Sequence, residues 1–543
     1  MITSWEGIAA RKREDRANRL KPYADWSLGD LTPPASQANV IALIHARLTE
    51  RERSFLSTDV TDLARRLAAR ECTALEVTTA FCKAAYAAQE LTNCISEVMF
   101  AQGLARAQEL DAHIARTGKV VGPLHGVPIS IKDHISVKGE DTASGYVAWA
   151  GKAIAGEDAP IVRILREAGA VLYVKTTNPQ AVFAPETASN IYGYTTNPFN
   201  RELSSGGSSG GEGALIGSRA GLLGVGTDIG GSIRCVLVSQ LRVYSDSHGY
   251  KSGSPRRGAD WPMAHSTRDL ELFCRVIMSY EPWNIDPATL AFPWKSSFAG
   301  AETKTKLLIG LLVDDGVVAP HPPIVEQLHK ARDALVAAGH EVIDFELQDS
   351  MHAFELIVKL LLPDAGADMR AILAESGEPA VPNVEALLAQ GEKYGVLTLA
   401  ETYAANLERD QFRARALKYW NDTALRTKSG RPIDAVLCPV SYTLAPTHYT
   451  AGWIGYTTYW NLLDLPQVTF PYGKSFEAST WVAQRAPLQP RNPIETIFQA
   501  QWDPKKFDGA PMGLSLVGRR WQEEKLLGIL KQVEDVVKVS EKA

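Results

Sequence analysis

Long apolar runs are missing from this chain of 543 residues. The longest unbroken one, Leu307–Val313, is far shorter than the roughly 20 residues that a membrane-spanning helix needs. The amino terminus carries charged residues where a signal peptide has its apolar stretch. These two absences predict a cytoplasmic protein without a transmembrane segment.

Runs of basic residues are also missing. Lys and Arg total 57 against 62 Asp and Glu, which gives a formal net charge of −5. A nucleic-acid-binding surface usually shows as a basic excess or a clustered basic stretch, so we expect no nucleic-acid partner. With 45% hydrophobic and 22% charged residues, the composition is that of an ordinary folded protein.

Cysteine is scarce as well. The cysteines include no C-x-x-C pair, are too few for a disulfide framework and have spacings that fit no zinc site. We therefore expect no metal site, and buried free thiols at Cys72, Cys82, Cys94, Cys235, Cys274 and Cys438.

Helical and strand-like apolar patterns alternate along most of the chain. The spacing predicts helices at 5–19, 73–88, 102–116, 159–168 and 323–338, the second opened by a capping box at Thr73 and Glu76. It predicts strands at 127–132, 170–174, 307–313, 341–345 and 435–439. This alternation, without a Gly/Ser linker or internal repeat, predicts an α/β fold: a single large domain whose mixed β-sheet core is surrounded by helices. We expect an accessory helical region at 1–57 and the main domain at 58–540.

Glycine is what the chain has in excess: of 42 glycines, 11 lie between Gly206 and Gly231. Glycine-rich loops of this kind bind dinucleotides, bind phosphates or stabilise an oxyanion. The dinucleotide motif fails because Gly224-x-Gly226 is followed by Gly230 one residue too late, and no P-loop motif is present. The nucleophile-elbow pattern G-x-S-x-G occurs at 206–210, but we predict no strand in the preceding 198–205, so that match is weak.

Three blocks form a more specific pattern. The sequence around Ser208 reads Gly-Gly-Ser-Ser-Gly-Gly-Glu-Gly-Ala-Leu, and the one ending at Ser232 reads Gly-Thr-Asp-Ile-Gly-Gly-Ser. Upstream, Gly-Val-Pro-Ile-Ser-Ile leads to Lys132. In order and rough spacing these blocks resemble the amidase signature family. Flanking pieces such as 452–461 and 512–518 resemble its fungal acetamidase branch and extend the match to most of the chain.

The resemblance implies the amidase signature fold and the hydrolysis of a small-molecule carboxamide to carboxylate and ammonia, without a cofactor. It implies a Ser–cis-Ser–Lys triad: Ser232 is the nucleophile that forms the acyl-enzyme, Ser208 the bridging serine held by a cis peptide bond, and Lys132 the base. Lysine is a poor base at its free pKa of about 10.4, and burial lowers that pKa by several units. A homodimer is a further expectation from the family.

The resemblance implies further site residues. Those expected to bind substrate, several through the backbone N–H groups of an oxyanion hole, are Val182, Ser208, Ile229, Gly230, Gly231 and Ser232. Three supporting residues are Ser209, which bonds the lysine, and Asp228 and Arg234, which brace the loop.

Two other groups of residues are candidates for a role in the active site, namely the histidines near Lys132 and an aromatic cluster. His125 and His134 flank Lys132, so a Ser–His–Asp arrangement is an alternative, although no histidine has a motif of its own. An aromatic cluster is predicted to be core rather than substrate pocket; it consists of Trp453, Tyr456, Tyr459 and Trp460.

After Arg234 the family pattern breaks and resumes at Trp261. We interpret 235–260 as an atypical segment that is out of register, as if read in another frame or from a misjudged splice. The run it replaces would carry the nucleophile loop into the core. A catalytically impaired amidase homologue is therefore one alternative, and an amidotransferase-type subunit is another.

Overall fold

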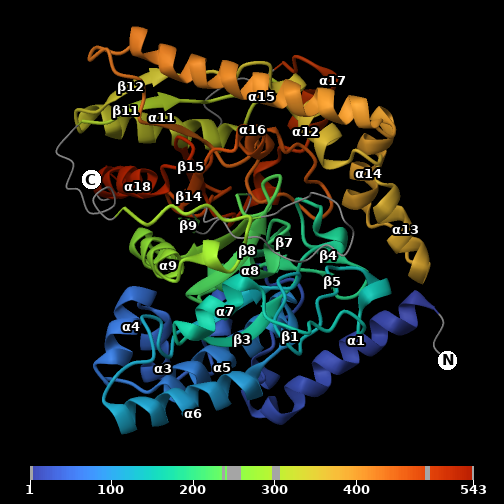
Figure 1. Cartoon of the computed structure of the whole chain (residues 1–543), viewed down its shortest axis with the longest axis vertical. Helices are drawn as coiled ribbons and strands as arrows, with labels where there is room; N and C mark the ends of the chain where they lie inside the picture. Colours follow the sequence, from blue (N-terminus) through green and yellow to red (C-terminus); the bar gives the residue numbers. More distant parts are fainter. Residues whose placement is uncertain (1–3, 235–238, 241–258, 296–305, 483–488, 541–543) are drawn as a thin grey trace. The chain divides into compact units, whose positions relative to one another are not determined.

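The computed structural model of the chain describes residues 4–234, 239–240, 259–295, 306–482 and 489–540 (Figure 1). They form two compact units. The first unit comprises Met1–Ser239, Val243–Trp294 and Asp368–Val384. The second comprises Gln240–Arg242, Lys295–Ala367 and Glu385–Ala543. Most of the predicted segment 235–260 lies outside the described residues, and the predicted boundary at 57/58 stays a prediction.

The main sheet of the first unit has the strand order β1-β3-β2-β8-β10-β9. Its strands are β1 (Ile95–Val98), β2 (Pro128–Lys132), β3 (Val171–Thr176), β8 (Leu223–Asp228), β9 (Ser239–Gln240) and β10 (Ala259–Ala264). The central strands β3, β2 and β8 run parallel, whereas β1 and β10 pair antiparallel to them. All residues of β2, β3 and β8 are buried, which matches their apolar runs.

Helices cover this sheet (Figure 1). Helix α5 (Ala74–Thr92) begins at the predicted capping box, in which Thr73 and Glu76 each accept a backbone N–H of the other. It packs against α6 (Phe100–Thr117) and contacts β2 and β3. Helix α8 (Gly210–Gly217) lies against β2, β3 and β8. The other helices of this unit are α1 (Trp5–Leu20), α2 (Ile41–Ile44), α3 (Glu50–Leu56), α4 (Val60–Ala68), α7 (Pro160–Glu167), α9 (Thr267–Ser279) and α13 (Ala367–Ser376).

One local prediction was wrong. We expected no strand before the G-x-S-x-G pattern, but β7 (Asn200–Ser204) occupies that segment and pairs antiparallel with β6 (Thr196–Asn197). The polar sequence of β7 shows no alternation of apolar residues, because the strand belongs to a two-stranded ribbon outside the main sheet. A similar ribbon joins β4 (Ala188–Ser189) and β5 (Gly193–Tyr194).

The second unit has its own mixed sheet, with the order β12-β11-β13-β15-β14. These strands are β11 (Leu308–Leu311), β12 (Glu341–Asp344), β13 (Ala435–Pro439), β14 (Gln467–Pro471) and β15 (Gly513–Val517). Its helices include α11 (Pro322–Ala337), α12 (Ser350–Leu361), α15 (Leu399–Asp422), α16 (Gly455–Leu463), α17 (Pro493–Gln499) and α18 (Glu523–Ser540), and α14 (Pro382–Tyr394) leads into it. The predicted α/β class with mixed sheets is confirmed.

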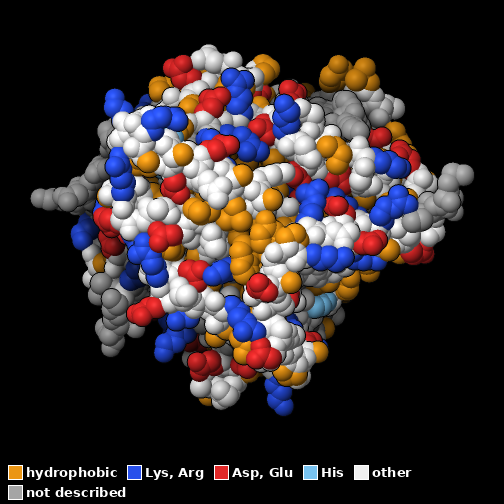
Figure 2. Space-filling view, turned by 90° about the horizontal axis from the view of Figure 1, so that it is seen from below, with side chains coloured by type: hydrophobic (Ala, Val, Ile, Leu, Met, Phe, Trp, Pro, Cys, Tyr) orange, Lys and Arg blue, Asp and Glu red, His pale blue; other side chains and the backbone are white. Residues whose placement is uncertain are grey.

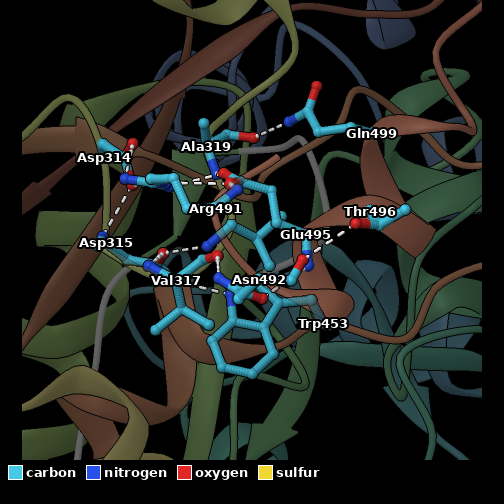
Figure 3. Close-up of polar contacts among 12 residues, drawn as sticks. Asp314, Asp315, Val317, Ala319, Trp453, Arg491, Asn492, Glu495, Thr496 and Gln499 are labelled. Carbon is cyan, nitrogen blue, oxygen red and sulfur yellow. Dashed lines mark hydrogen bonds and ion pairs between the residues drawn. The ribbon is translucent and has the colours of Figure 1, made fainter. Parts of the chain in front are cut away.

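A polar network fixes the start of α17 in the second unit (Figure 3). Arg491 contacts Asp314 at 3.0 Å and Glu495 at 2.6 Å, and Asn492 caps the helix by accepting the backbone N–H of Glu495. The indole N–H of Trp453 donates to Asp315 Oδ2 over 2.6 Å. These contacts join the loop after β11 to α17 and to the residues before α16.

The aromatic cluster is confirmed as core. Tyr459 and Trp460 pack with residues of α12 and α15 in one cluster, and Trp453 and Tyr456 pack in another with Val317. No described cysteine forms a disulfide, and those that are free and buried are Cys72, Cys82, Cys94, Cys274 and Cys438. Cys235 lies outside the described residues.

Basic and acidic side chains are interspersed on the face seen in Figure 2, with apolar side chains gathered near its centre. Within the described ranges, no helix is both long enough and apolar enough to cross a membrane. The same ranges contain no group of three or more His, Cys, Asp or Glu side chains placed to hold a metal ion.

Candidate active site

Lys132 ends strand β2 and is fully buried. Its Nζ lies 2.7 Å from Ser208 Oγ, 3.0 Å from Ser209 Oγ and 2.9 Å from Thr227 Oγ1. Three hydroxyl groups, two from the residues just before α8 and one from β8, therefore surround one amine. The sequence patterns did not single out Thr227, although it stands in the block that ends at Ser232.

Ser208 and Ser209 lie just before α8 and are both fully buried. The peptide bond between Gly207 and Ser208 is cis, as the resemblance implies. Gly207 has no room for a side chain, since an added Cβ would lie 2.6 Å from both Ala184 O and Glu186 N. Ser208 therefore lies beside Lys132 in a segment whose backbone packs directly against the backbone at Ala184 and Glu186.

The loop after β8 carries Ser232, which is partly exposed. The backbone N–H of Ser209 donates to the carbonyl oxygen of Ser232 over 3.0 Å, so the two serine-bearing segments are joined. Asp228 Oδ1 accepts the N–H of Gly231 at 2.9 Å, and Asp228 Oδ2 accepts that of Ile233 at 3.2 Å. Arg234 Nε lies 3.3 Å from Asp228 Oδ2.

The remaining predicted residues occupy the loop and a neighbouring segment. Ile229 and Gly230 are partly exposed, whereas Gly231 is buried with a φ of +118°. Val182 is buried, has a φ of +57° and lies two residues before the segment that packs on Gly207.

Neither flanking histidine has the surroundings of a catalytic base. His125 Nδ1 accepts the backbone N–H of Val121 over 3.1 Å. His134 is buried, and its Nδ1 has no hydrogen-bond partner among the described residues. Burial holds the pKa of His134 well below its ordinary value.

A second buried group adjoins the lysine. Glu212, in the first turn of α8, accepts hydrogen bonds from Ser130 Oγ at 2.6 Å and Thr176 Oγ1 at 2.8 Å. The sequence patterns contained this glutamate but assigned it no role. Its partners lie on β2 and β3, and a single sequence does not reveal the register between those strands.

The site thus combines a buried lysine with two adjacent serines on a mixed α/β scaffold. The family model described as Amidase matches residues 76–527. The chain is 36% identical over 549 residues to an acetamidase of Emericella nidulans, covering 98% of both chains. It is 35% identical to an acetamidase of Aspergillus oryzae, again over 98% of both. The chain therefore belongs to the amidase family and is a hydrolase that acts on amides.

A solved structure supports the same conclusion. That of a fatty acid amide hydrolase matches with a TM-score of 0.89 and 31% identity, over 98% of this chain and 94% of that one. The resemblance to the amidase signature family and its fungal acetamidase branch is thus confirmed.

Proposed function

We propose that the protein hydrolyses a small carboxamide to carboxylate and ammonia through an acyl-enzyme on Ser232, with Ser208 relaying protons to Lys132. The observation that carries this proposal is the 2.7 Å contact between the buried side chains of Lys132 and Ser208, which joins Nζ to Oγ. The residue after Ser208, Ser209, donates its backbone N–H to the carbonyl oxygen of Ser232. Acyl transfer needs an activated nucleophile, an oxyanion site and an acid for the leaving group.

In this proposal Lys132 reacts as a neutral amine. The hydroxyl of Ser209 donates to the carbonyl oxygen of Thr227 over 3.3 Å, so its oxygen is left to accept an N–H of Lys132. Burial disfavours the ammonium form. A neutral Lys132 has a lone pair for the proton of Ser208, which then takes the proton of Ser232.

The reaction is completed in two stages. Ser232 Oγ attacks the carbonyl carbon, and the proton returns through Ser208 to the leaving nitrogen, which departs as ammonia. Water then attacks the acyl-enzyme through the same relay and releases the carboxylate. Each proton that Lys132 takes up is given back, so the enzyme needs no further reactant.

Backbone N–H groups of the loop after β8 stabilise the oxyanion in this proposal. We assign the donors to Ile229, Gly230 and Ser232, as the resemblance implies, whereas the N–H of Gly231 donates to Asp228. Gly231 contributes its positive φ, and Asp228 braces the loop together with Arg234. Val182 and Ser208 border the acyl group.

Fluorophosphonate labelling tests the nucleophile. We expect the wild type to be labelled and Ser232→Ala not to be. Ser218→Ala is the control, because Ser218 is a serine of the same unit whose hydroxyl donates to Leu215 O at the end of α8. Labelling that persists in Ser232→Ala would overturn the assignment.

Ammonia release from a panel of amides tests the base. Lys132→Ala should abolish release while the protein remains folded. An impaired homologue, the alternative raised by 235–260, predicts an unlabelled wild type. An amidotransferase-type subunit predicts turnover only with partner chains, which the match to an acetamidase over 98% of both chains does not favour.

Two expectations accompany this function. A homodimer predicts twice the mass of 59.2 kDa in light scattering of the purified protein. Cytoplasmic localisation predicts that a fluorescent fusion distributes through the cytoplasm.

A further inference from the structure

Glu212 is a fully buried carboxyl group held in one place by two hydroxyls. Each of its oxygens accepts one hydrogen bond, Oε2 from Ser130 and Oε1 from Thr176. Burying a carboxyl group costs folding free energy unless the group is compensated. We therefore expect a buried carboxyl in the first turn of α8 to have a structural or functional role.

Strand register places this carboxyl beside the lysine. Ser130 precedes Lys132 by two residues on β2, so the two side chains share a face of the sheet. Thr176 of β3 is the register partner of Lys132. Both donors to Glu212 are thus immediate neighbours of Lys132.

Strand β8 leaves the space that the carboxyl fills. Gly224 pairs with Ser130 across the sheet. A Cβ at Gly224 would overlap Glu212 Oε2 and would lie 2.6 Å from Ser130 Oγ. Gly224, which belongs to the stretch that does not match the dinucleotide motif, therefore makes room for Glu212.

The charges around Glu212 single out Lys132. Burial raises the pKa of Glu212 to about 7, while the hydrogen bonds from Ser130 and Thr176 and the attraction of Lys132 act the other way. Tyr173 and Cys94 also face this carboxyl, and burial raises the pKa of Tyr173 well above its ordinary value and that of Cys94 to about 12. Both stay neutral near pH 7, so among these groups Lys132 is the one that can become a cation beside Glu212.

We propose that Glu212 is a positioning residue for Lys132, whose carboxylate supplies the counter-charge for the ammonium formed when Lys132 takes the proton of Ser208. The inference rests on the proposed function and adds a residue to it. The proton moves from Ser208 Oγ to Lys132 Nζ as Ser208 takes that of Ser232, and the substrate oxygen gains the negative charge. Glu212 itself gains and loses nothing.

The physical reason is the cost of a buried ammonium. Without an opposite charge nearby, a fully buried lysine resists protonation and becomes a weaker base. A neutral group in place of Glu212 leaves the shape intact and removes that support. Lys132 then loses its proton at lower pH and accepts one from Ser208 less readily.

The pH profile of kcat/KM for amide hydrolysis tests the inference. In Glu212→Gln we expect the acidic limb to move down by about one pH unit and the plateau to fall by up to about tenfold. Asp269→Asn is the matched control, since Asp269 is a buried carboxylate of the same unit that accepts the N–H groups of Val60 and Thr61. Its acidic limb should coincide with that of the wild type.

An unmoved acidic limb in a folded Glu212→Gln would overturn the inference while the proposed function stands. Thr176→Val is the second variant if Glu212→Gln fails to fold: it removes one donor, favours the neutral carboxyl and should move the limb the same way by a smaller amount. A wild type without Ser232-dependent turnover would contradict the proposed function and this inference together.

Discussion

The backbone N–H of Ser209 donates to the carbonyl oxygen of Ser232 over 3.0 Å. This bond joins two glycine-rich stretches that lie on opposite sides of helix α8 in the sequence. The hydroxyl of Ser209 also lies 3.0 Å from Lys132 Nζ. One residue therefore holds the segment of the proposed nucleophile and contacts the proposed base, so the spacing between the two depends on the short turn into α8.

Removal of the Thr227 hydroxyl should weaken the base. In Thr227→Val, Lys132 loses the contact of 2.9 Å with Oγ1, and a buried hydrogen bond contributes about 1–1.5 kcal/mol. We expect kcat for ammonia release to fall by about tenfold. Thr457→Val is the control, because that hydroxyl donates to Ile454 O at the start of α16. A kcat equal to that of the wild type would contradict a role for Thr227.

A methyl group at Gly224 should disturb both the fold and the site. The new Cβ overlaps the Glu212 carboxyl, and overpacking of this kind costs about 1–3 kcal/mol of unfolding free energy. We expect Gly224→Ala to unfold at lower urea concentration and to lose most of its activity. In Gly156→Ala, where nothing lies within 4 Å, the midpoint should stay within error of the wild type.

Sequence patterns predicted the elements whose signals are local. The capping box of Thr73 and Glu76 begins α5 as expected, and the apolar run Ala435–Pro439 is strand β13 with those same ends. Strand β7 was missed because its pairing with β6, rather than its own polar residues, makes it a strand. Local patterns thus identify elements with an apolar face and fail for ribbons that lack one.

The sequence predicted those site residues to which the resemblance assigns a role. The blocks contained Lys132 and Ser208, and the structure places their side chains 2.7 Å apart. Thr227 and Glu212 were missed because their importance depends on which strand lies beside β2. That neighbour relation joins residues nearly a hundred positions apart, and no local spacing reports it.

Buried Lys12 should be a strong stabilising contact of helix α1. Its Nζ lies 2.6 Å from Glu97 and 3.1 Å from Asp141, and all three side chains are buried. Lys12→Met leaves two buried carboxylates without this cation, and a broken buried ion pair costs about 3–5 kcal/mol. Chemical denaturation should show that loss.

A surface lysine provides the comparison for Lys12. In Lys330→Met, the exposed pair with Glu326 is removed, and we expect a change within about 0.5 kcal/mol. If both variants lose the same small amount, Lys12 does not anchor α1.

His321 should make the stability of the second unit depend on pH. The residue is fully buried among Tyr442, Trp502 and Phe507, and burial lowers its pKa to about 4, while its contact with Phe498 O acts the other way. Well above about pH 6.5 neither the folded nor the unfolded histidine is protonated, and its contribution is fully present. As the pH falls toward 4, the unfolded state alone binds a proton, so stability is lost at about 1.4 kcal/mol per pH unit.

His321→Gln isolates this contribution. Between pH 6.5 and 4.5 the wild type should lose about 2 kcal/mol more unfolding free energy than His321→Gln, because glutamine does not titrate. Urea unfolding at several pH values, followed by tryptophan fluorescence, measures the difference. His352→Gln replaces a histidine that is 41% exposed and should keep the steep decline of the wild type. If the curves for the wild type and His321→Gln run parallel, protonation of His321 is not what destabilises the protein in acid.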